Sequence, residues 1–507
     1  MNTFFRRPWA GTLTVAALLI FSTAVSGQTI VPVPKVTGPI PVTANSVPFL
    51  AAGMNLVPLG GQYDPAKTGD LATAGYVEEE FIVSGSANVY DWAADGTLSV
   101  KTPNAPYATR ILVRRPANAA RFSGNVFVEL MNTARRFDWP MMWGYSREHF
   151  MENGDTWIGV TMPGAAAGLK KFNPARYAAV SFANPSTTPC TPTAALSDVE
   201  EGLRWDAVSQ IVSLLKSSVA GRPLAGLRVE AVFLATQGGD VQTYINAIHP
   251  NAKLANGKPV FDGYLLKSPA APSRISQCAA APAVSDPRRA IRKTNVPVIA
   301  VVAQGEIVDA LAYRRPDSDA ADDKFRMYEI AGAGHIDKSA YSGFPVFPDQ
   351  IAAAGTAQGT PDWPFTAKCD PEIPMMPTPM MTYAFDATYS ILTQWVRKGT
   401  AAPHGAPLQV KDGAVVLDAN GHGVGGVRNP YVEAPAATYF TNSTGPGVCR
   451  EMGHEVLYDR AKFQMLYPTA KAYTDKVAQA ADRLVKERWL TDSDAKKVKQ
   501  EAQARAK

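Results

Sequence analysis

Short apolar runs, separated by loops and amphipathic stretches, constrain the fold of this chain more than any other feature. They cover residues 126–131, 157–162, 231–235, 263–266, 297–303 and 327–330, and a further strand is expected over 107–115. Runs of this length that are apolar throughout are typical of strands buried on both faces. The stretches between them would form helices that cover those faces. The sequence therefore predicts an α/β fold with a mostly parallel central sheet.

Two helices and one long loop can be placed within this pattern. Residues 197–200 have the spacing of a capping box, and an apolar stripe follows over 203–215. A second helix is predicted over 383–398, where Gly399 would end it. Residues 338–380 are rich in Pro and Met. A segment that long without a periodic pattern is typical of a lid or a binding loop.

The charge of the chain lies mainly at its two ends. The 507 residues carry a formal net charge of +5, of which Arg6 and Arg7 supply two. Residues 471–507 hold ten Lys or Arg against six Asp or Glu. The body between the ends is close to neutral, and a groove for nucleic acid is therefore not expected.

Residues 1–27 have the features of a signal peptide. Arg6 and Arg7 form a charged start, residues 13–21 form an apolar run too short to span a bilayer comfortably, and small residues over 24–27 offer cleavage sites. No later run reaches 18 consecutive apolar residues, so stable membrane insertion is not expected. The mature chain is predicted to be exported, either to the periplasm or outside the cell.

The chain has four cysteines, Cys190, Cys278, Cys369 and Cys449. An even number in an exported chain permits two disulfides, and four cysteines allow three pairings. None of them has the spacing of a CxxC or Cys/His metal site. The sequence therefore predicts at least one disulfide, no metal and no other cofactor.

Polar residues follow three of the predicted strands at their carboxyl ends, where the sites of open α/β sheets lie. The run 231–235 leads into Thr236-Gln237-Gly238 and then a helix, which is the context of a nucleophile elbow with Thr236 at the nucleophile position. Glu306 follows 297–303 as the acid, with Asp309 as the alternative, and His335 follows 327–330. The order of nucleophile, acid and histidine is that of the α/β hydrolases.

The chemistry of these residue types is acyl transfer. A hydroxyl is a weak nucleophile and needs a base such as His335 within hydrogen-bond reach, while a carboxylate fixes the tautomer of the imidazole. Backbone N–H groups would stabilise the oxyanion. The Gln237 amide is one predicted donor, and the other is expected from the loop after 126–131, near Asn132 and Thr133.

Several stretches resemble the large exported "alpha/beta hydrolase domain" family of bacteria and fungi over residues 45–455. They are residues 126–130 with Asn132, residues 159–161, Thr236-Gln237 with 244–246 and 249–250, the box 329–335, and 425–428 with Pro430. The resemblance implies a serine esterase in which the serine falls on Thr236, the histidine on His335 and the acid on Glu306. Two departures stand out, Thr236 for the serine and Leu234 for the first glycine of the elbow. Because a β-branched residue is costly in the strained backbone of an elbow, a catalytically inactive binding protein on a hydrolase fold is the alternative.

The sequence thus predicts a signal peptide over 1–27, an α/β-hydrolase domain over 28–465 and a polar, solvated helical tail over 466–507. Its predicted activity is hydrolysis of a small-molecule carboxylic ester, and no oligomeric state is predicted. Ser146 and Ser268 are weaker nucleophile candidates, because the first lacks the elbow glycine and nothing pairs the second with a base. His249 is expected to end a helix. Trp139 and residues 141–143 would either floor an apolar acyl pocket or pack in the core.

Overall fold

The computed structural model describes residues 29–343, 369–372 and 378–506, apart from 42–70, 72, 94–96, 135, 284 and 446. The predicted signal peptide and most of the predicted loop over 338–380 lie outside these residues.

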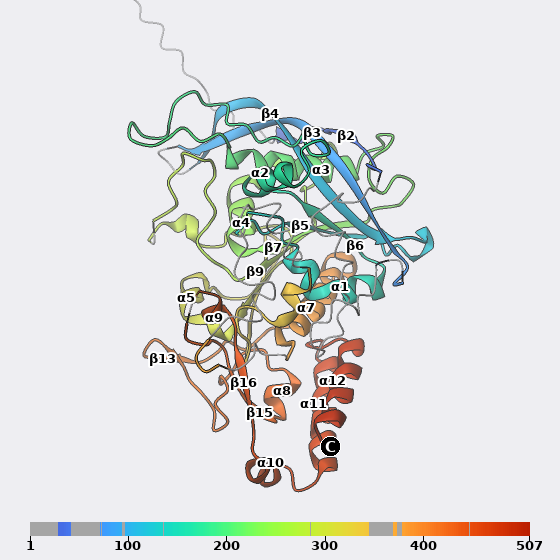
Figure 1. The fold of residues 1–507 in the computed structure, drawn as a ribbon, viewed down its shortest axis with the longest axis vertical. Coiled ribbons are helices and arrows are strands. Elements are labelled where there is room, and N and C mark those ends of the chain that lie inside the picture. Colours follow the sequence, from blue (N-terminus) through green and yellow to red (C-terminus); the bar gives the residue numbers. More distant parts are fainter. Residues whose placement is uncertain are drawn as a thin grey trace, which may run out of the picture.

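A ten-stranded sheet forms the centre of the molecule (Figure 1). Its strands are β2 (Lys35–Thr37), β3 (Tyr76–Trp92), β4 (Leu98–Pro116), β5 (Asn125–Leu130), β6 (Thr156–Val160), β7 (Ala231–Gln237), β9 (Gly263–Lys267), β10 (Val298–Ala303), β11 (Ser318–Ala320) and β12 (Asp323–Ile330). They lie in the order β11-β12-β10-β9-β7-β5-β6-β4-β3-β2. The six neighbours from β12 to β6 are parallel, and every residue of β5, β6, β9 and β10 is buried. This confirms the mostly parallel sheet, with each of the six apolar runs forming one of its strands.

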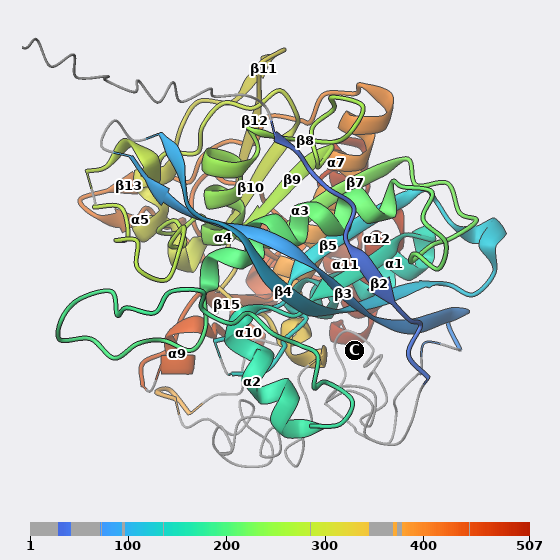
Figure 2. The same cartoon turned by 90° about the horizontal axis from the view of Figure 1, so that it is seen from above.

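The antiparallel end of the sheet is a long hairpin, β3–β4, which crosses over the helices on one side of the molecule (Figure 2). The sequence shows strand signals from about residue 75, but it predicts a strand with bounds only over 107–115, within β4. Charged pairs across the hairpin explain the omission: Arg114 Nε lies 2.7 Å from Glu78 Oε2, and Arg115 Nη2 lies 2.7 Å from Glu79 Oε1. These paired charges interrupt the apolar pattern from which the other strands were predicted. Three two-stranded pairs lie outside the main sheet. They are β1 (Thr29–Ile30) with β8 (Ala252–Lys253), β13 (Val410–Lys411) with β14 (Ala414–Val415), and β15 (Ala437–Phe440) with β16 (His454–Leu457).

Helices cover both faces of the sheet (Figure 1). They are α1 (Met141–Asn153), α2 (Pro163–Phe172), α3 (Arg204–Leu215), α4 (Gly238–Thr243), α5 (Ile307–Ala310), α7 (Met380–Lys398), α8 (Pro430–Glu433), α9 (Gly447–Glu451), α10 (Arg460–Leu466), α11 (Ala470–Lys486) and α12 (Asp492–Arg505). The pair α1 and α7 packs on one face, and α3 and α4 lie on the other. The helix predicted over 383–398 is confirmed as α7, and it ends at Gly399 with φ of 69°.

The predicted capping box over 197–200 is wrong. The Ser197 hydroxyl donates to the Val199 carbonyl, so it does not cap a helix. The first helical turn starts after Glu200, whose Oε1 accepts from the Gly202 N–H at 2.8 Å. A carboxylate at this position satisfies an amide that the helix itself leaves without a partner.

Aromatic packing between the sheet and the α1/α7 layer forms much of the core. The ring of Phe127 on β5 lies 5.3 Å from Phe150 of α1 and 4.8 Å from Tyr389 of α7. Trp139 and the three residues 141–143 are each at most 3% exposed. Of the two roles predicted for these four residues, core packing is therefore the one that the structure supports.

The C-terminal tail is helical, as predicted, but it is docked and not solvated. One side of α11 buries Tyr473, Val477 and Leu484, and α12 buries Val498. Lys497 of α12 lies 2.9 Å from Glu148 of α1. The expectation of a solvated tail is wrong. The tail is very polar overall, but its few apolar residues recur at helical spacing, so each helix has one narrow apolar stripe that it buries against the rest of the protein.

Two disulfides join segments that lie far apart in the sequence: Cys190–Cys278 links two loops, and Cys369–Cys449 links a loop to α9. This is one of the three pairings that the sequence permitted. Among the helices that the structure describes, none is both long enough and apolar enough to cross a membrane.

Candidate active site

The candidate site lies at the carboxyl edge of the parallel strands. From β5 the chain continues to β6 on one side, whereas β7 lies on the other side and leads to β9, so the strand order reverses between β5 and β7. Ligands of open α/β sheets bind at such a switch point. Thr236 lies at the end of β7, and Ser268, Glu306 and His335 follow β9, β10 and β12 at the same edge.

Thr236 is held inside the sheet. Thr236 is 1% exposed, and its Oγ1 donates to the Leu130 carbonyl of β5 at 2.8 Å. It lies within β7, and the residue directly before α4 is Gln237, with φ of −59°. The φ of Thr236 is not positive, so the strain expected for a threonine at an elbow does not arise. The hydrogen bond ties Thr236 to β5, and the structure does not bring its hydroxyl into contact with His335.

Glu306 and His335 are in direct contact. Glu306 ends the short 3₁₀ turn Gln304–Glu306 after β10, and its Oε1 is hydrogen-bonded to His335 Nδ1. Burial acts to raise the pKa of Glu306, but the charges of His335 and Lys267 outweigh it and hold the pKa at about 2. The carboxylate is therefore ionised at every pH at which the protein would work. Asp309, the alternative acid, has an exposed side chain in α5.

Two residues of this site were missed or underrated in the sequence. Lys267, the last residue of β9, is 1% exposed, and its Nζ lies 3.0 Å from Ser268 Oγ and 3.3 Å from His335 Nδ1. The Ser268 hydroxyl donates to Glu306 Oε2 at 2.9 Å. The signal that could have revealed them is a lysine at the end of a strand that is otherwise apolar, since an unpaired lysine is rarely buried.

The loop after β5 offers fewer oxyanion donors than expected. The Asn132 N–H already donates to the Trp139 carbonyl at 3.0 Å, and the Asn132 side chain accepts from the Ala134 N–H at 2.8 Å. The amides of Thr133 and Gln237 are the remaining candidates from the predicted set.

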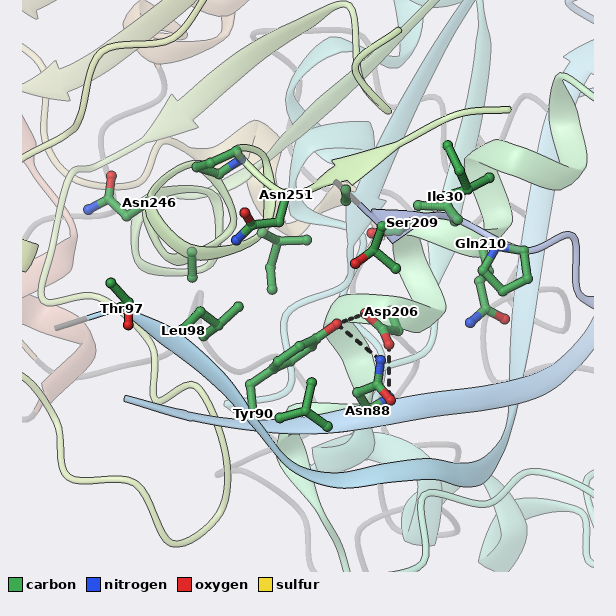
Figure 3. A pocket seen from close by; sticks show the side chains of 18 of the residues that line it. Ile30, Asn88, Tyr90, Thr97, Leu98, Asp206, Ser209, Gln210, Asn246 and Asn251 are labelled. Atoms are coloured by element: carbon green, nitrogen blue, oxygen red, sulfur yellow. Dashed lines mark hydrogen bonds between the residues drawn. The ribbon is translucent and has the colours of Figure 1, made fainter. Parts of the chain in front are cut away.

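A cavity of about 720 Å³ lies away from these residues, between the β3–β4 hairpin, α3 and the helical turn after α4 (Figure 3). Its lining includes neither Thr236, Glu306 nor His335. Its polar groups bond to one another: the Tyr90 hydroxyl donates to Asp206 Oδ1 at 2.7 Å, and the Asn88 N–H donates to Asp206 Oδ2 at 2.8 Å. We therefore do not place the chemistry in this cavity.

Other candidates have structural surroundings. His249 follows the helical turn Tyr244–Ile248, and its Nδ1 lies 2.9 Å from the Tyr264 hydroxyl. Ser146 is buried within α1. Within the described part of the chain, no group of three or more His, Cys, Asp or Glu residues could hold a metal ion.

The strand order and the Glu306–His335 pair at the carboxyl edge are features of the α/β hydrolases. The model of the "Alpha/beta hydrolase domain" family matches residues 36–500, so the chain belongs to this family. The match includes most of the helical tail. Comparison with curated protein sequences gave no match.

Solved structures with a detectable likeness include hydrolases of low sequence identity. The esterase Est22 is 13% identical, with a TM-score of 0.27 over 56% of this chain and 80% of that one. A glucuronoyl esterase from Solibacter usitatus is 11% identical, with a TM-score of 0.26 over 56% and 82%. An a/b serine hydrolase without lid from Xanthomonas campestris is 12% identical, with a TM-score of 0.24 over 54% and 97%. TM-scores this low do not indicate a substrate for this protein.

Proposed function

We propose that this protein is an exported hydrolase that cleaves carboxylic esters of small molecules through an acyl-enzyme. In this proposal Thr236 is the nucleophile, His335 the general base and Glu306 its orienting acid. The observation that carries the proposal is the hydrogen bond between His335 Nδ1 and Glu306, beside the switch point of the sheet. An ionised carboxylate on Nδ1 fixes the imidazole tautomer in which Nε2 can accept a proton.

The chemical steps follow from that tautomer. The Thr236 hydroxyl would exchange the Leu130 carbonyl for His335 Nε2, give up its proton there and attack the ester carbonyl. The amides of Gln237 and Thr133 would stabilise the oxyanion, at roughly 2.7–4 kcal/mol for each donor. His335 would then protonate the leaving alcohol, and water activated by the same imidazole would release the acid.

Export is supported by the disulfides. Both Cys190–Cys278 and Cys369–Cys449 are formed, and disulfides persist mainly in oxidising compartments. With the signal peptide predicted over 1–27, this favours a periplasmic or secreted protein.

Thr236→Ser is expected to raise turnover of p-nitrophenyl esters about tenfold, because it removes the methyl group beside the hydroxyl while keeping the nucleophile. Initial rates over several acyl chain lengths measure this, with Thr236→Ala as the matched control that removes the hydroxyl. Turnover unaffected by Thr236→Ala would exclude Thr236 as the nucleophile.

The alternative is a binding protein on an inactive hydrolase fold. The burial of Thr236 and its hydrogen bond to Leu130 favour it, because a nucleophile has to reach the substrate. The same assay separates the two functions: a native protein without turnover that gains activity in Thr236→Ser would favour the binding protein.

A further inference from the structure

A buried lysine lies beside the Glu306–His335 pair and takes no part in the triad. Lys267 donates from Nζ to Ser268 Oγ at 3.0 Å, and Ser268 donates its hydroxyl proton to Glu306 Oε2 at 2.9 Å. The same Nζ lies 3.3 Å from His335 Nδ1. One chain of hydrogen bonds therefore runs from the lysine through the serine to the carboxylate that contacts the imidazole.

The charges around Lys267 account for its burial. A buried ammonium is costly unless other groups pair with it. Burial lowers the pKa of Lys267, and the negative charges of Glu306, Glu451 and Asp337 offset this effect only in part. Glu306 follows β10, Glu451 ends α9, and Asp337 lies two residues after His335. Three carboxylates thus favour the charged form of Lys267, and one of them, Glu306, also contacts His335.

The serine is fixed by its backbone. Ser268 has φ of 56°, in the left-handed region that non-glycine residues seldom adopt. Its N–H donates to the Val301 carbonyl of β10 at 2.8 Å. Gly238, the first residue of α4, packs closely against Ser268 from another element. A Cβ atom at Gly238 would lie only 2.3 Å from the Ser268 carbonyl oxygen. Neighbouring elements on both sides thus hold a costly conformation that directs the hydroxyl at Glu306, and such conformations cluster at functional sites.

We propose that Lys267 and Ser268 are positioning residues of this site, which hold the Glu306 carboxylate against His335 and oppose protonation of the imidazole. One oxygen of Glu306 contacts His335 Nδ1, while the other accepts from Ser268 and from the Ala303 N–H at 3.2 Å. The carboxylate therefore cannot turn away from the ring without losing both donors. A positive charge 3.3 Å from the ring disfavours the imidazolium and so acts against the Glu306 carboxylate, which favours it. The catalytic meaning of this inference rests on the proposed ester hydrolysis.

The test is the titration of His335 in Lys267→Met, which keeps the length of the side chain and removes its charge. NMR spectra of protein with labelled histidines give the pH midpoint for each ring, and the His335 signal is the one absent from His335→Gln. We expect the His335 midpoint to rise by roughly one pH unit or more, because a like charge that disfavoured the protonated ring is gone. Lys258→Met, at an exposed lysine, is the matched control and should leave the midpoint unchanged.

This measurement needs no turnover, so a native protein without esterase activity would refute the proposed function and leave the inference on Lys267 standing. If the protein is active, the acid limb of kcat/KM should move with the NMR midpoint. Ser268→Ala should lower kcat about tenfold with little change in KM. Lys267→Gln replaces Lys267→Met if the latter does not fold. An unchanged His335 midpoint in a folded Lys267 variant overturns the inference, and so does labelling of Ser268 by a fluorophosphonate, which would make Ser268 a nucleophile.

Discussion

Replacing His335 with alanine is expected to lower kcat/KM for p-nitrophenyl esters by on the order of 10⁴-fold, because the base that activates the nucleophile and the acid that releases the alcohol are then both lost. Glu306→Gln should cost roughly 10³–10⁴-fold, since a neutral amide on Nδ1 no longer fixes the tautomer or stabilises the imidazolium. Because Glu306 stays ionised above a pKa of about 2, activity should rise with pH only as His335 loses its proton. Steady-state rates across pH measure all three effects.

A second histidine–carboxylate pair provides the control for this prediction. His404 Nδ1 lies 2.9 Å from Asp317 Oδ2, but the His404 side chain is 62% exposed and far along the chain from the proposed site. His404→Ala should leave turnover within about twofold of the native value, since exposed ion pairs contribute little. Near-UV circular dichroism checks that each variant keeps its packing. Turnover that survives His335→Ala in a folded protein would refute the role of His335.

The sheet could be predicted from the sequence because its strands are buried on both faces. Apart from Glu129, Thr161 and Glu329, the runs between 126 and 330 are apolar, because a strand with both faces buried has few positions for polar side chains. Charge pairing obscured the bounds of β3, where Glu78 and Glu79 form ion pairs with arginines on β4. Such charges are neutralised by charges on the neighbouring strand, and the sequence of one strand does not show which strand lies beside it.

Only those parts of the site that follow from the order of residues along the chain could be predicted. His335 and Glu306 each follow a strand whose position in the sheet is set by the fold, and the structure places the two in contact. The surroundings of Thr236 depend on one strand neighbour, Leu130, and those of Ser268 on a left-handed backbone angle. Neither a hydrogen bond between strands nor a single φ is encoded by residue type, so the contacts of both hydroxyls required the structure.

Arg110→Met is expected to lower the free energy of unfolding by about 3–5 kcal/mol, because it leaves the buried Asp138 carboxylate without its ion-pair partner, whereas Glu80 keeps Arg176. Arg110 of β4 is fully buried, contacts Asp138 through Nη2 and lies 3.5 Å from Glu80. Its Nε donates to Thr161 Oγ1 at 2.9 Å, and Thr161 donates to Asp138 Oδ2 at 2.6 Å. Urea denaturation followed by circular dichroism measures the loss.

Arg115→Met, on the same strand, is the matched control for that prediction. Arg115 and Glu79 form an ion pair whose side chains are 22% and 23% exposed, so its loss should cost at most about 1 kcal/mol. Asp138 directly precedes Trp139, whose N–H and carbonyl both bond to Asn132, and the buried network thereby anchors the loop that holds the Thr133 amide. Arg110→Met should therefore also reduce esterase kcat at temperatures where the variant is still folded. Equal unfolding free energies for the two variants would show that the buried ion pairs of Arg110 contribute no more to stability than the partly exposed Arg115–Glu79 pair. An unchanged kcat would show that the oxyanion site does not depend on the anchoring of this loop.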